Sequence, residues 1–368
     1  MKKILTVALV LAILIPAISQ AKESDQPGPK VTSSTRRQFT QNAVFPSAGG
    51  AELTVVATAG DESRTHTAMS QAMGQASSKA GALIAEVTKV NAQPRKTPVA
   101  ISSELFAVLD RCRQFSALTE SAFDITGAEK TEGFKQYFFA ANWRKLKLNK
   151  KKQTVTIKSE GLDIDPRTFG IMLRGFLADD IIAGLKKQGW SNAQIRVGNV
   201  TRSIGKDIHT AWRIRLDAPT AAETGKYAYR AYDYSVGDIA TAMISPRLFP
   251  RGIIDPRTRT LVDKPAVINT LIFANEASTA TAYAIAAYAK SAVDAQRGLN
   301  FITAHSEVKA ILIAPDGTVL SSKKINMSKP SYAGTVKTKK TEVVTEKTTE
   351  ATTQKTVDKT VTATKETK

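Results

Sequence analysis

The sequence predicts an α+β fold in which mixed sheets and packed helices share a single core. Strand-like and helix-like apolar patterns alternate irregularly along the chain, without the regular strand–helix–strand period of a doubly wound fold. The chain has 368 residues, of which 42% are hydrophobic, and this is enough for one large domain or two small ones. No internal repeat is recognisable, so we expect one core.

The first expected elements of that core are a strand and two helices. Residues 51–57 form an apolar, β-branched run that predicts a strand, and apolar residues recur at helical spacing over 69–87. Ser102 and Ser103 are both suitable caps for a second helix. Cys112 lies on the apolar face of this helix and is the only cysteine, so a disulfide within the chain is excluded and a buried, unreactive thiol is expected.

The second half of the chain continues the mixture. Residues 145–159 alternate basic and apolar side chains, which predicts exposed strands joined by a Lys-rich turn. The further expected elements are a helix over 174–188 that stops at Gly189, strands over 195–197 and 212–216, an Ala-rich helix over 277–295 that ends before Gly298, and a strand over 309–313 that enters a turn at 315–317.

The N-terminal residues have the pattern of a secretory signal peptide over 1–21. Lys2 and Lys3 precede an apolar run at 4–15, and Ala21 ends a small-residue site that a signal peptidase could cut. The run is short for a membrane span, so we expect a periplasmic or secreted protein with no membrane span after cleavage. An uncleaved N-terminal anchor is the alternative. Residues 22–45 are polar and are expected to form a linker.

The C-terminal residues have a composition typical of disorder. Residues 326–368 are expected to form a disordered tail, and from Lys337 onward they consist almost wholly of Thr, Lys, Glu and Val, without aromatic residues. Such a segment buries too little apolar surface to offset the entropy of ordering. A tether to the cell envelope and a passive solubilising tail are both compatible with this composition.

The formal net charge of +19 indicates an affinity for polyanions. The basic residues are spread along the chain, so the charge does not choose between anionic envelope polymers and nucleotide phosphates. Nucleic acid is not an expected partner, because the chain carries an export signal and no recognisable reading motif.

Common catalytic motifs are absent from the sequence. It contains no phosphate-binding P-loop, no dinucleotide-binding glycine fingerprint and no nucleophile elbow. The three histidines, His66, His209 and His305, lie in unrelated segments without metal-ligand spacing. A histidine-based zinc site or a catalytic triad is therefore not expected.

A set of short segments nevertheless follows a recognisable order. In chain order they are Glu86–Asn91, Leu118–Asp124, Leu173–Asp179, Val197–Asn199, Ile253–Thr258, the Ala-rich stretch from Ala277, and Ala310–Gly317. In order and spacing they resemble the ApbE-type FAD:protein FMN transferase family, whose motifs read S-E-I-S-x-L-N, T-x-G-A-F-D, K-G-Y-A-V-D, G-G-D, H-I-I-D-P-x-T-G and A-D-A-x-x-T-A. The resemblance covers about residues 46–325, and no single motif is decisive.

The resemblance implies a flavin-binding protein. Members of the family split FAD with the help of Mg²⁺ and attach FMN through its phosphate to a Thr or Ser of a target protein. Glu86 and Asn91 match the first motif. By the same correspondence, the residues expected to line a site for FAD are Ala122, Phe123, Asp124, Arg174, Gly175, Asp179 and Asp255.

The departures from the family pattern fall on the positions that carry its chemistry. Thr281 stands where the family has its Asp metal ligand, and Ile285 replaces a Thr ligand. Mg²⁺ prefers carboxylate oxygens, so Mg²⁺ binding is not expected. Gly252 replaces the histidine before the I-I-D-P motif, Arg259 replaces its glycine, and Ser121 replaces the glycine before Ala122 and Phe123. No catalytic residue and no metal ligand is therefore assigned.

Three functions are compatible with this sequence. The first is a relative that binds FAD or a related nucleotide and has lost or weakened the Mg²⁺-dependent transferase activity. The second is an active FAD:protein FMN transferase whose metal oxygens come from Asp124, Asp179, Asp255 or Glu276. The third is a non-enzymatic envelope scaffold that binds anionic polymers through its basic surface. A flavin nucleotide is the expected partner in the first two, and a target protein is expected in the second.

Overall fold

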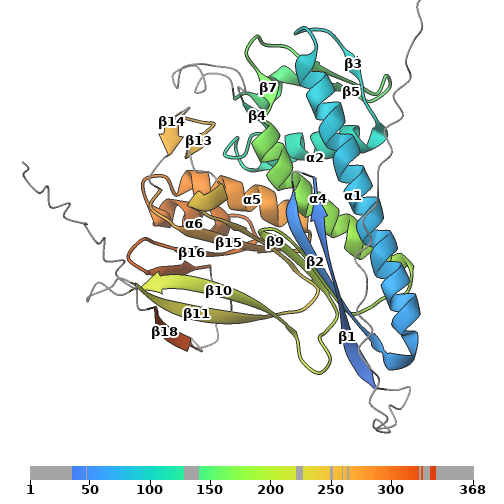
Figure 1. Cartoon of the computed structure of the whole chain (residues 1–368). Coiled ribbons are helices and arrows are strands. Elements are labelled where there is room, and N and C mark those ends of the chain that lie inside the picture. The colour runs from blue at the N-terminus through green and yellow to red at the C-terminus, as the bar shows by residue number, and fades with distance from the viewer. Residues whose placement is uncertain are drawn as a thin grey trace, which may run out of the picture.

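The computed structural model describes residues 35–46, 48–127, 141–220, 227–248, 252–258, 260–262, 265–322, 325 and 332–336. Its main layer is an eight-stranded sheet of order β1-β2-β8-β9-β12-β15-β16-β17, in which every neighbouring pair is antiparallel (Figure 1). The strands are β1 Arg36–Phe45, β2 Gly49–Thr58, β8 Ala193–Val197, β9 Val200–Ile204, β12 Ala240–Ile244, β15 Asn269–Ala274, β16 Lys309–Ile313 and β17 Val319–Ser321.

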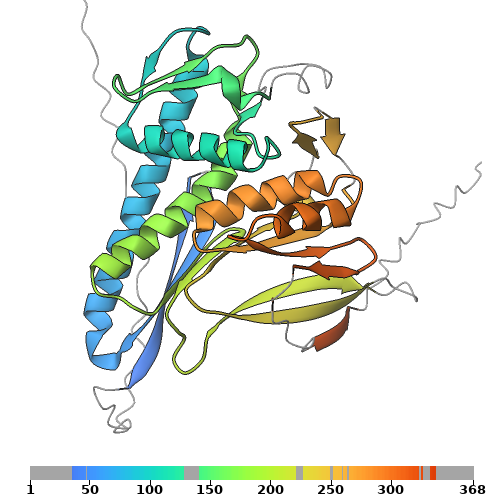
Figure 2. The same ribbon diagram turned by 180° about the vertical axis from the view of Figure 1, so that it is seen from behind.

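One face of this sheet is covered by four helices, which are α1 Glu62–Ala92, α4 Pro166–Lys187, α5 Ala277–Lys290 and α6 Ala295–Thr303. The order follows the sheet: α1 contacts β1 and β2, α4 contacts β8 and β9, α5 contacts β12 and β15, and α6 contacts β16 (Figures 1 and 2). The residues between the helices and the sheet form one large buried cluster. The α+β prediction with a single core is confirmed by this arrangement.

The opposite face of the sheet is covered by a second sheet of order β10-β11-β18, with β10 Trp212–Thr220, β11 Tyr227–Val236 and β18 Tyr332–Val336 (Figure 1). Trp212 and Val236 pack here with Phe273 and Ile311 of the large sheet. The strand β18 lies within residues 326–368, which were expected to be disordered. The five residues of β18, Tyr-Ala-Gly-Thr-Val, pair with β11. The rest of residues 326–368 lies outside the described residues.

The N-terminal boundary of the fold also differs from the prediction. Residues 36–45 belong to the expected polar linker, but they form β1 and pair with β2 over ten residues. Phe39 and Phe45 are buried on one face of this strand, with the partly buried Gln41 between them, and Thr40 and Asn42 are exposed on the other face. The alternation is weak in the sequence because β1 is an edge strand with one solvated side. Residues 1–34, which include the expected signal peptide, lie outside the described residues.

The helices α1 and α2 confirm the predicted apolar periodicity. The predicted positions Met69, Met73 and Val87 are all buried on α1. In α2, Ser103–Leu118, the Ser102 hydroxyl accepts a hydrogen bond from the Leu105 amide at 3.1 Å. Such a cap satisfies one of the free amides of the first turn. Cys112 is fully buried, as expected, and burial raises the pKa of its thiol.

The Ala-rich helix is shorter than predicted. Instead of continuing to residue 295, α5 ends at Lys290, and α6 begins after Asp294, whose side chain accepts a hydrogen bond from the Gln296 amide at 2.9 Å. Gly298 lies inside α6 rather than beyond a helix end. A β-carbon on Gly298 would lie 1.8 Å from Ser291 Oγ, so glycine lets α6 fold back tightly on the end of α5 (Figure 2).

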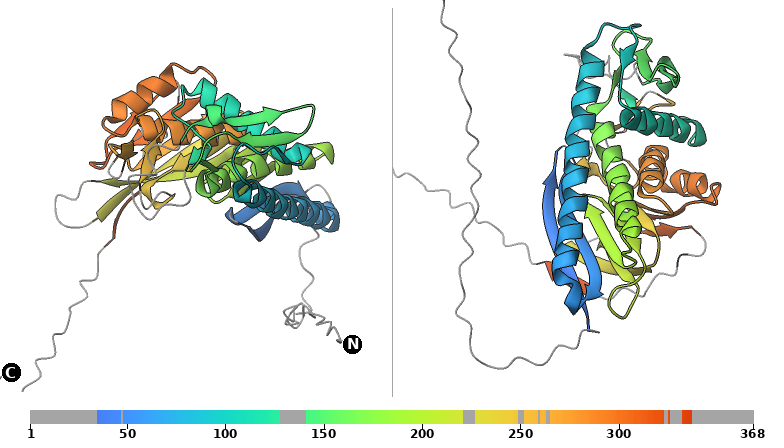
Figure 3. Two further views of the ribbon diagram at one scale, coloured as in Figure 1. Left: turned by 90° about the horizontal axis from the view of Figure 1, so that it is seen from above. Right: turned by 90° about the vertical axis from the view of Figure 1, so that its right-hand side faces the viewer.

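A small sheet of order β3-β6-β5 lies at one end of the molecule, beside the C-terminal end of α1 (Figures 1 and 3). Its strands are β3 Val99–Ala100, β5 Leu146–Asn149 and β6 Thr154–Ile157. The predicted Lys-rich turn joins β5 and β6, but the strands are not fully exposed, because Leu146 and Val155 are buried. The remaining strand pairs are β4 Thr126–Gly127 with β7 Asp163–Ile164, and β13 Ile253–Asp255 with β14 Thr260–Val262.

No helix among the described residues is long and apolar enough to cross a membrane.

Candidate functional site

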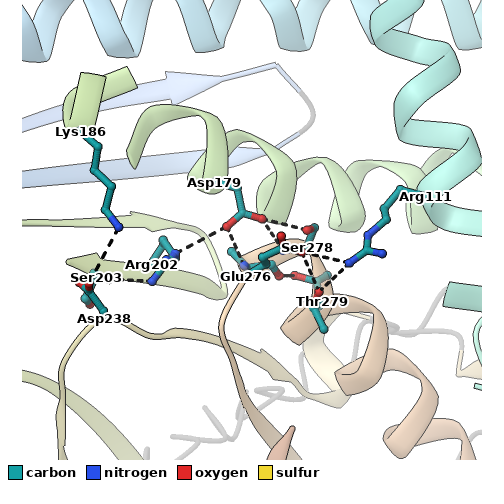
Figure 4. Close-up of polar contacts among 11 residues, drawn as sticks. Arg111, Asp179, Lys186, Arg202, Ser203, Asp238, Glu276, Ser278 and Thr279 are labelled. Atoms are coloured by element: carbon teal, nitrogen blue, oxygen red, sulfur yellow. Dashed lines mark hydrogen bonds and ion pairs between the residues drawn. The ribbon is translucent and has the colours of Figure 1, made fainter. Parts of the chain in front are cut away.

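The residues of the third motif lie where α4 crosses the N-terminal end of α5. Gly175 and Asp179 are one helical turn apart and therefore share a face of α4. Asp179 accepts hydrogen bonds from the Ala277 amide at 2.7 Å and from the Ser278 amide and hydroxyl at 2.9 Å each (Figure 4). Glu276, the residue before α5, makes no capping bond of its own. Asp179 thus caps α5 from a neighbouring helix.

Gly175 permits the close approach of the two helices. A β-carbon on Gly175 would lie 2.8 Å from each of three atoms, which are Ala277 O, Ser278 Cα and Thr281 Oγ1. Thr281 is fully buried, and its hydroxyl donates to Ala277 O at 2.7 Å. Ile285, one turn further along α5, is also buried. The crossing is therefore filled with protein atoms at the positions where the family resemblance implies metal ligands.

Burial has a strong effect on the charge of Asp179. Desolvation raises the pKa of this carboxyl group, and the hydrogen bonds from Ser278 and Ala277 lower it in part. Arg202 lowers it further, with its Nε 3.7 Å from Asp179 Oδ1. The net direction is upward, so the fold tolerates the carboxylate mainly because several donors converge on it.

A hollow of about 400 Å³ opens beside this crossing, between α4, the N-terminal end of α5 and β9. Three basic side chains line it, and each is matched by a carboxylate: Arg111 by Glu276 at 3.0 Å, Arg202 by Asp179 at 3.7 Å, and Lys186 by Asp238 at 3.9 Å (Figure 4). No sequence motif indicated Arg111, Lys186 or Arg202, because the three basic residues lie on different elements that are distant along the chain. Their charges balance, so the hollow has no strong preference for anions.

Arg174 points away from this hollow, toward the turn between β8 and β9. Its Nη1 donates to Asn199 Oδ1 at 2.6 Å, and Asn199 Nδ2 donates to Met243 O at 2.8 Å. Arg174 Nε is buried and has no hydrogen-bond partner among the described residues. Burial lowers the pKa of the guanidinium group, which nevertheless stays charged. A buried donor without a partner is costly, and an anionic or carbonyl oxygen of a ligand would satisfy it.

Asp124 lies in the segment that follows α2. It accepts hydrogen bonds from the Thr126 amide at 2.9 Å, the Thr126 hydroxyl at 2.7 Å and the Trp143 amide at 3.0 Å. Desolvation raises the pKa of Asp124 to about 6, although these bonds favour the carboxylate. Ala122 and Phe123 are fully buried, and the Phe123 ring meets Phe115 edge-on at 6.4 Å between centroids. All three residues make internal contacts in the structure.

Asp255 lies at the end of β13 and shapes the turn that follows it. It accepts hydrogen bonds from the Arg257 amide at 3.0 Å and from Arg257 Nη2 at 2.9 Å. Gly252 has a φ of 80°, a left-handed conformation that glycine adopts without strain. Arg259, the other replaced position of this motif, lies outside the described residues.

Glu86 and Asn91, the polar residues that match the first motif, make hydrogen bonds within the fold. Glu86 Oε2 accepts hydrogen bonds from the Ser102 amide and hydroxyl at 3.0 Å each, which fixes the start of α2 against α1. Asn91 pairs with the backbone of Ile164 through both ends of its amide, at 2.8 and 2.9 Å. Both residues therefore connect elements that are distant in the sequence.

The structure separates the predicted residues into two groups at opposite ends of α5. Gly175 and Asp179 lie at its N-terminal end. The segment after α2 is held near its C-terminal end, where Lys290 pairs with Glu120 at 3.0 Å. The strand β13, which carries Asp255, also contacts α5. Since α5 has 14 residues, the two ends are about 20 Å apart.

The donor set at the crossing does not fit Mg²⁺. Among the described residues, no group of three or more His, Cys, Asp or Glu side chains is placed to hold a metal ion. Thr281 already uses its hydroxyl within α5, Ile285 offers no oxygen, and both oxygens of Asp179 accept hydrogen bonds from the helix end. Mg²⁺ requires near-octahedral oxygen coordination, which these side chains do not provide.

Comparison with known proteins identifies the family. A family model described as the ApbE family matches residues 50–312. No curated protein matches the chain. Among solved structures, the flavin transferase ApbE from Vibrio cholerae has a TM-score of 0.62 at 17% identity, with 79% of this chain and 98% of that chain covered.

Two further solved structures share the fold. The flavinyl transferase ApbE of Pseudomonas stutzeri, in its apo form, has a TM-score of 0.62 at 16% identity, over 78% of this chain and 94% of its own. The ApbE protein of Thermotoga maritima has a TM-score of 0.60 at 18% identity, and the match covers 78% of this chain and 97% of that chain. Because the family model covers well over half of the sequence, the chain belongs to the ApbE family.

Proposed function

We propose that this protein is an exported member of the ApbE family that binds FAD or a related flavin nucleotide and has lost or weakened the Mg²⁺-dependent transfer of FMN. The observation that carries the proposal is the packing of Gly175 of α4 against Thr281 of α5. Phosphoryl transfer of this kind depends on a metal ion that neutralises charge on the phosphates. The crossing supplies neither the oxygen ligands nor the space for that ion.

Nucleotide binding is supported by the Arg174 guanidinium group, one of whose donors has no hydrogen-bond partner among the described residues. That donor is Nε, which is buried. By the sequence resemblance, Arg174 stands at the lysine of the K-G-Y-A-V-D motif, so a positive charge is kept at this position. We propose that Arg174 donates to an oxygen of the flavin nucleotide. Ala122, Phe123, Asp124, Gly175, Asp179 and Asp255 would then contribute indirectly, because their internal contacts position the elements at the two ends of α5.

The active-transferase alternative requires Asp124, Asp179, Asp255 or Glu276 to provide metal oxygens. Each of these carboxylates already has partners: Thr126 and Trp143 for Asp124, the start of α5 for Asp179, Arg257 for Asp255, and Arg111 for Glu276. A metal would have to displace these donors from carboxylates that lie on separate elements. We therefore favour the proposal that the Mg²⁺-dependent transfer of FMN is lost or weakened.

Export is part of the proposal and rests on the sequence of residues 1–21, which lie outside the described residues. Their basic start, apolar run and small-residue site are those of a signal peptide. A periplasmic or secreted location follows from this assignment.

A transfer assay tests the loss of activity. The purified mature chain is mixed with FAD, Mg²⁺ and a Thr-containing acceptor peptide, and AMP release and the intact mass of the peptide are followed over time. We expect AMP release no faster than in a sample with chelator, and no FMN adduct on the peptide. Mg²⁺-dependent AMP release together with an FMN adduct would show that the transferase works.

A further inference from the structure

The β5–β6 hairpin carries the densest positive charge of the described fold. Residues 144–158, Arg-Lys-Leu-Lys-Leu-Asn-Lys-Lys-Lys-Gln-Thr-Val-Thr-Ile-Lys, contain seven basic residues and no acidic residue. The basic residues are Arg144, Lys145, Lys147, Lys150, Lys151, Lys152 and Lys158, and all seven are exposed. This set is called the basic hairpin below.

None of these seven basic side chains forms an ion pair with a described carboxylate, although Arg144 is near enough to Asp124 to lower the pKa of that carboxyl group. No Asp or Glu of the described residues lies within 4.0 Å of any basic side chain of the hairpin, whereas Lys79, Lys186 and Lys290 elsewhere all have carboxylate partners. Lys96 adds a further exposed charge, since its amide donates to Ile157 O at 2.8 Å and places it beside β6. Like charges held this close repel one another, and an anionic partner relieves that repulsion.

The hairpin presents its lysines on a well-defined turn. Leu146 and Val155 anchor the two strands in the core. At the tip, Asn149 Oδ1 accepts a hydrogen bond from the Lys152 amide at 3.1 Å, and Gln153 Nε2 donates to Lys150 O at 3.1 Å. The backbone of the turn at Lys150–Lys152 is therefore held by the Asn149 and Gln153 side chains. The lysine side chains take no part in these hydrogen bonds.

The position of the hairpin suits a flat partner. Figures 1 and 3 show the small sheet at one end of the elongated molecule, beyond the C-terminal half of α1 and away from the β10-β11-β18 sheet. A surface that meets this end would leave the helices, the hollow beside α5 and the opposite sheet free. The hairpin can therefore bind without covering the α4–α5 crossing.

We propose that the basic hairpin docks the protein on a lipid surface that carries anionic phosphodiester headgroups. Six of its seven basic residues are lysines, which act as point charges toward phosphates and do not impose the planar two-pronged geometry of arginine. Juxtamembrane segments and amphipathic helices that bind anionic lipids carry four to eight clustered basic residues, and the hairpin has a comparable number. The hairpin also lacks a free aromatic ring for base stacking, because the Trp143 ring beside it is covered by Arg144 at 4.6 Å.

The test compares two variants with the same charge. Lys150, Lys151 and Lys152 are replaced together with Gln in one variant. In the other, the exposed lysines Lys187, Lys206 and Lys309, which lie on other elements, are replaced together with Gln. Both variants of the mature chain and the unmodified chain are sedimented with vesicles of equal parts phosphatidylglycerol and phosphatidylcholine, with vesicles of phosphatidylcholine alone, and in the presence of soluble polyphosphate. Thermal unfolding checks that both variants are folded.

We expect the unmodified chain to bind the phosphatidylglycerol vesicles and not the neutral ones, with binding that weakens as salt rises. The hairpin variant should bind roughly tenfold to a hundredfold more weakly, since each lysine near an anionic surface contributes about 1 kcal/mol. The variant at the three distant lysines should bind nearly as well as the unmodified chain. Equal weakening in both variants would show that overall charge, not the hairpin, is responsible, and binding to polyphosphate but not to vesicles would overturn the lipid assignment.

Discussion

Gly175 and Thr281 meet at the point where α4 crosses α5, and a β-carbon on Gly175 would lie 2.8 Å from the Thr281 hydroxyl oxygen. Ala277 O and Ser278 Cα, both backbone atoms, would be equally close. Because two of these three atoms belong to the backbone, the clash could not be removed by rotating a side chain. The crossing is thus specified by a glycine on one helix and a small, internally bonded side chain on the other.

We predict that Gly175→Ala destabilises the protein, because the helices must move apart to accept the methyl group. The expected loss is about 1–3 kcal/mol in the free energy of unfolding, measured by urea denaturation. Gly184→Ala is the matched control on the same helix, since no atom lies within 4 Å of a β-carbon there. That variant should be as stable as the unmodified protein or more so, because alanine favours helix. Equal stability of both variants would mean that the helices are not in tight contact.

A second prediction concerns the metal position itself. Thr281→Asp restores the family residue, but it places a carboxylate in a fully buried helix crossing. We expect a fall in the midpoint of thermal unfolding well beyond that of Thr281→Val, which removes only the hydroxyl bond, worth about 1 kcal/mol. Added Mg²⁺ should not restore the midpoint of Thr281→Asp, because Ile285 and the packed helices supply no further oxygens. Recovery with Mg²⁺ would show that one carboxylate is enough to rebuild the site.

A third prediction is a pH dependence that originates at Asp124. Its pKa is raised from 3.8 to about 6, so the folded state holds the proton more tightly than the unfolded state does. The stability that Asp124 contributes is therefore full below about pH 4 and is lost as the pH rises through about 6. Over this window the unfolding free energy of the unmodified protein should fall by about 3 kcal/mol relative to Asp124→Asn. Urea denaturation of both proteins at pH 4 and pH 7 measures this difference, and a constant difference would contradict it.

The elements with strong periodicity were predictable from the sequence. The buried stripe of α1 and the Ser102 cap of α2 follow from local patterns, and the structure confirms both. The strand β1 could not be predicted, because an edge strand with one solvated side has few apolar residues. The break between α5 and α6 is marked locally by the Asp294 cap, whereas the tight return of α6 onto α5 depends on the close approach of Gly298 to Ser291, which the sequence pattern does not show.

The candidate site was predictable only as a set of positions. Motif order indicated Asp179 and Gly175, but their roles follow from α5, which comes about 100 residues later in the chain. Arg111 and Arg202 reach the same hollow from elements without any motif, so the sequence could not indicate them. The sequence resemblance alone predicts that Thr281 stands at the position of the family's Asp metal ligand. Only the structure shows that Thr281 is packed tightly between α4 and α5.

The most direct test of the proposed function is a titration of the mature protein with FAD, in the presence and absence of Mg²⁺, followed by flavin fluorescence and calorimetry. The proposal predicts saturable binding whose affinity does not change when Mg²⁺ is added, and binding that weakens in Arg174→Ala. Affinity that rises with Mg²⁺, accompanied by slow release of AMP, would contradict the loss of the metal site, and the absence of any binding would contradict the retention of a flavin pocket.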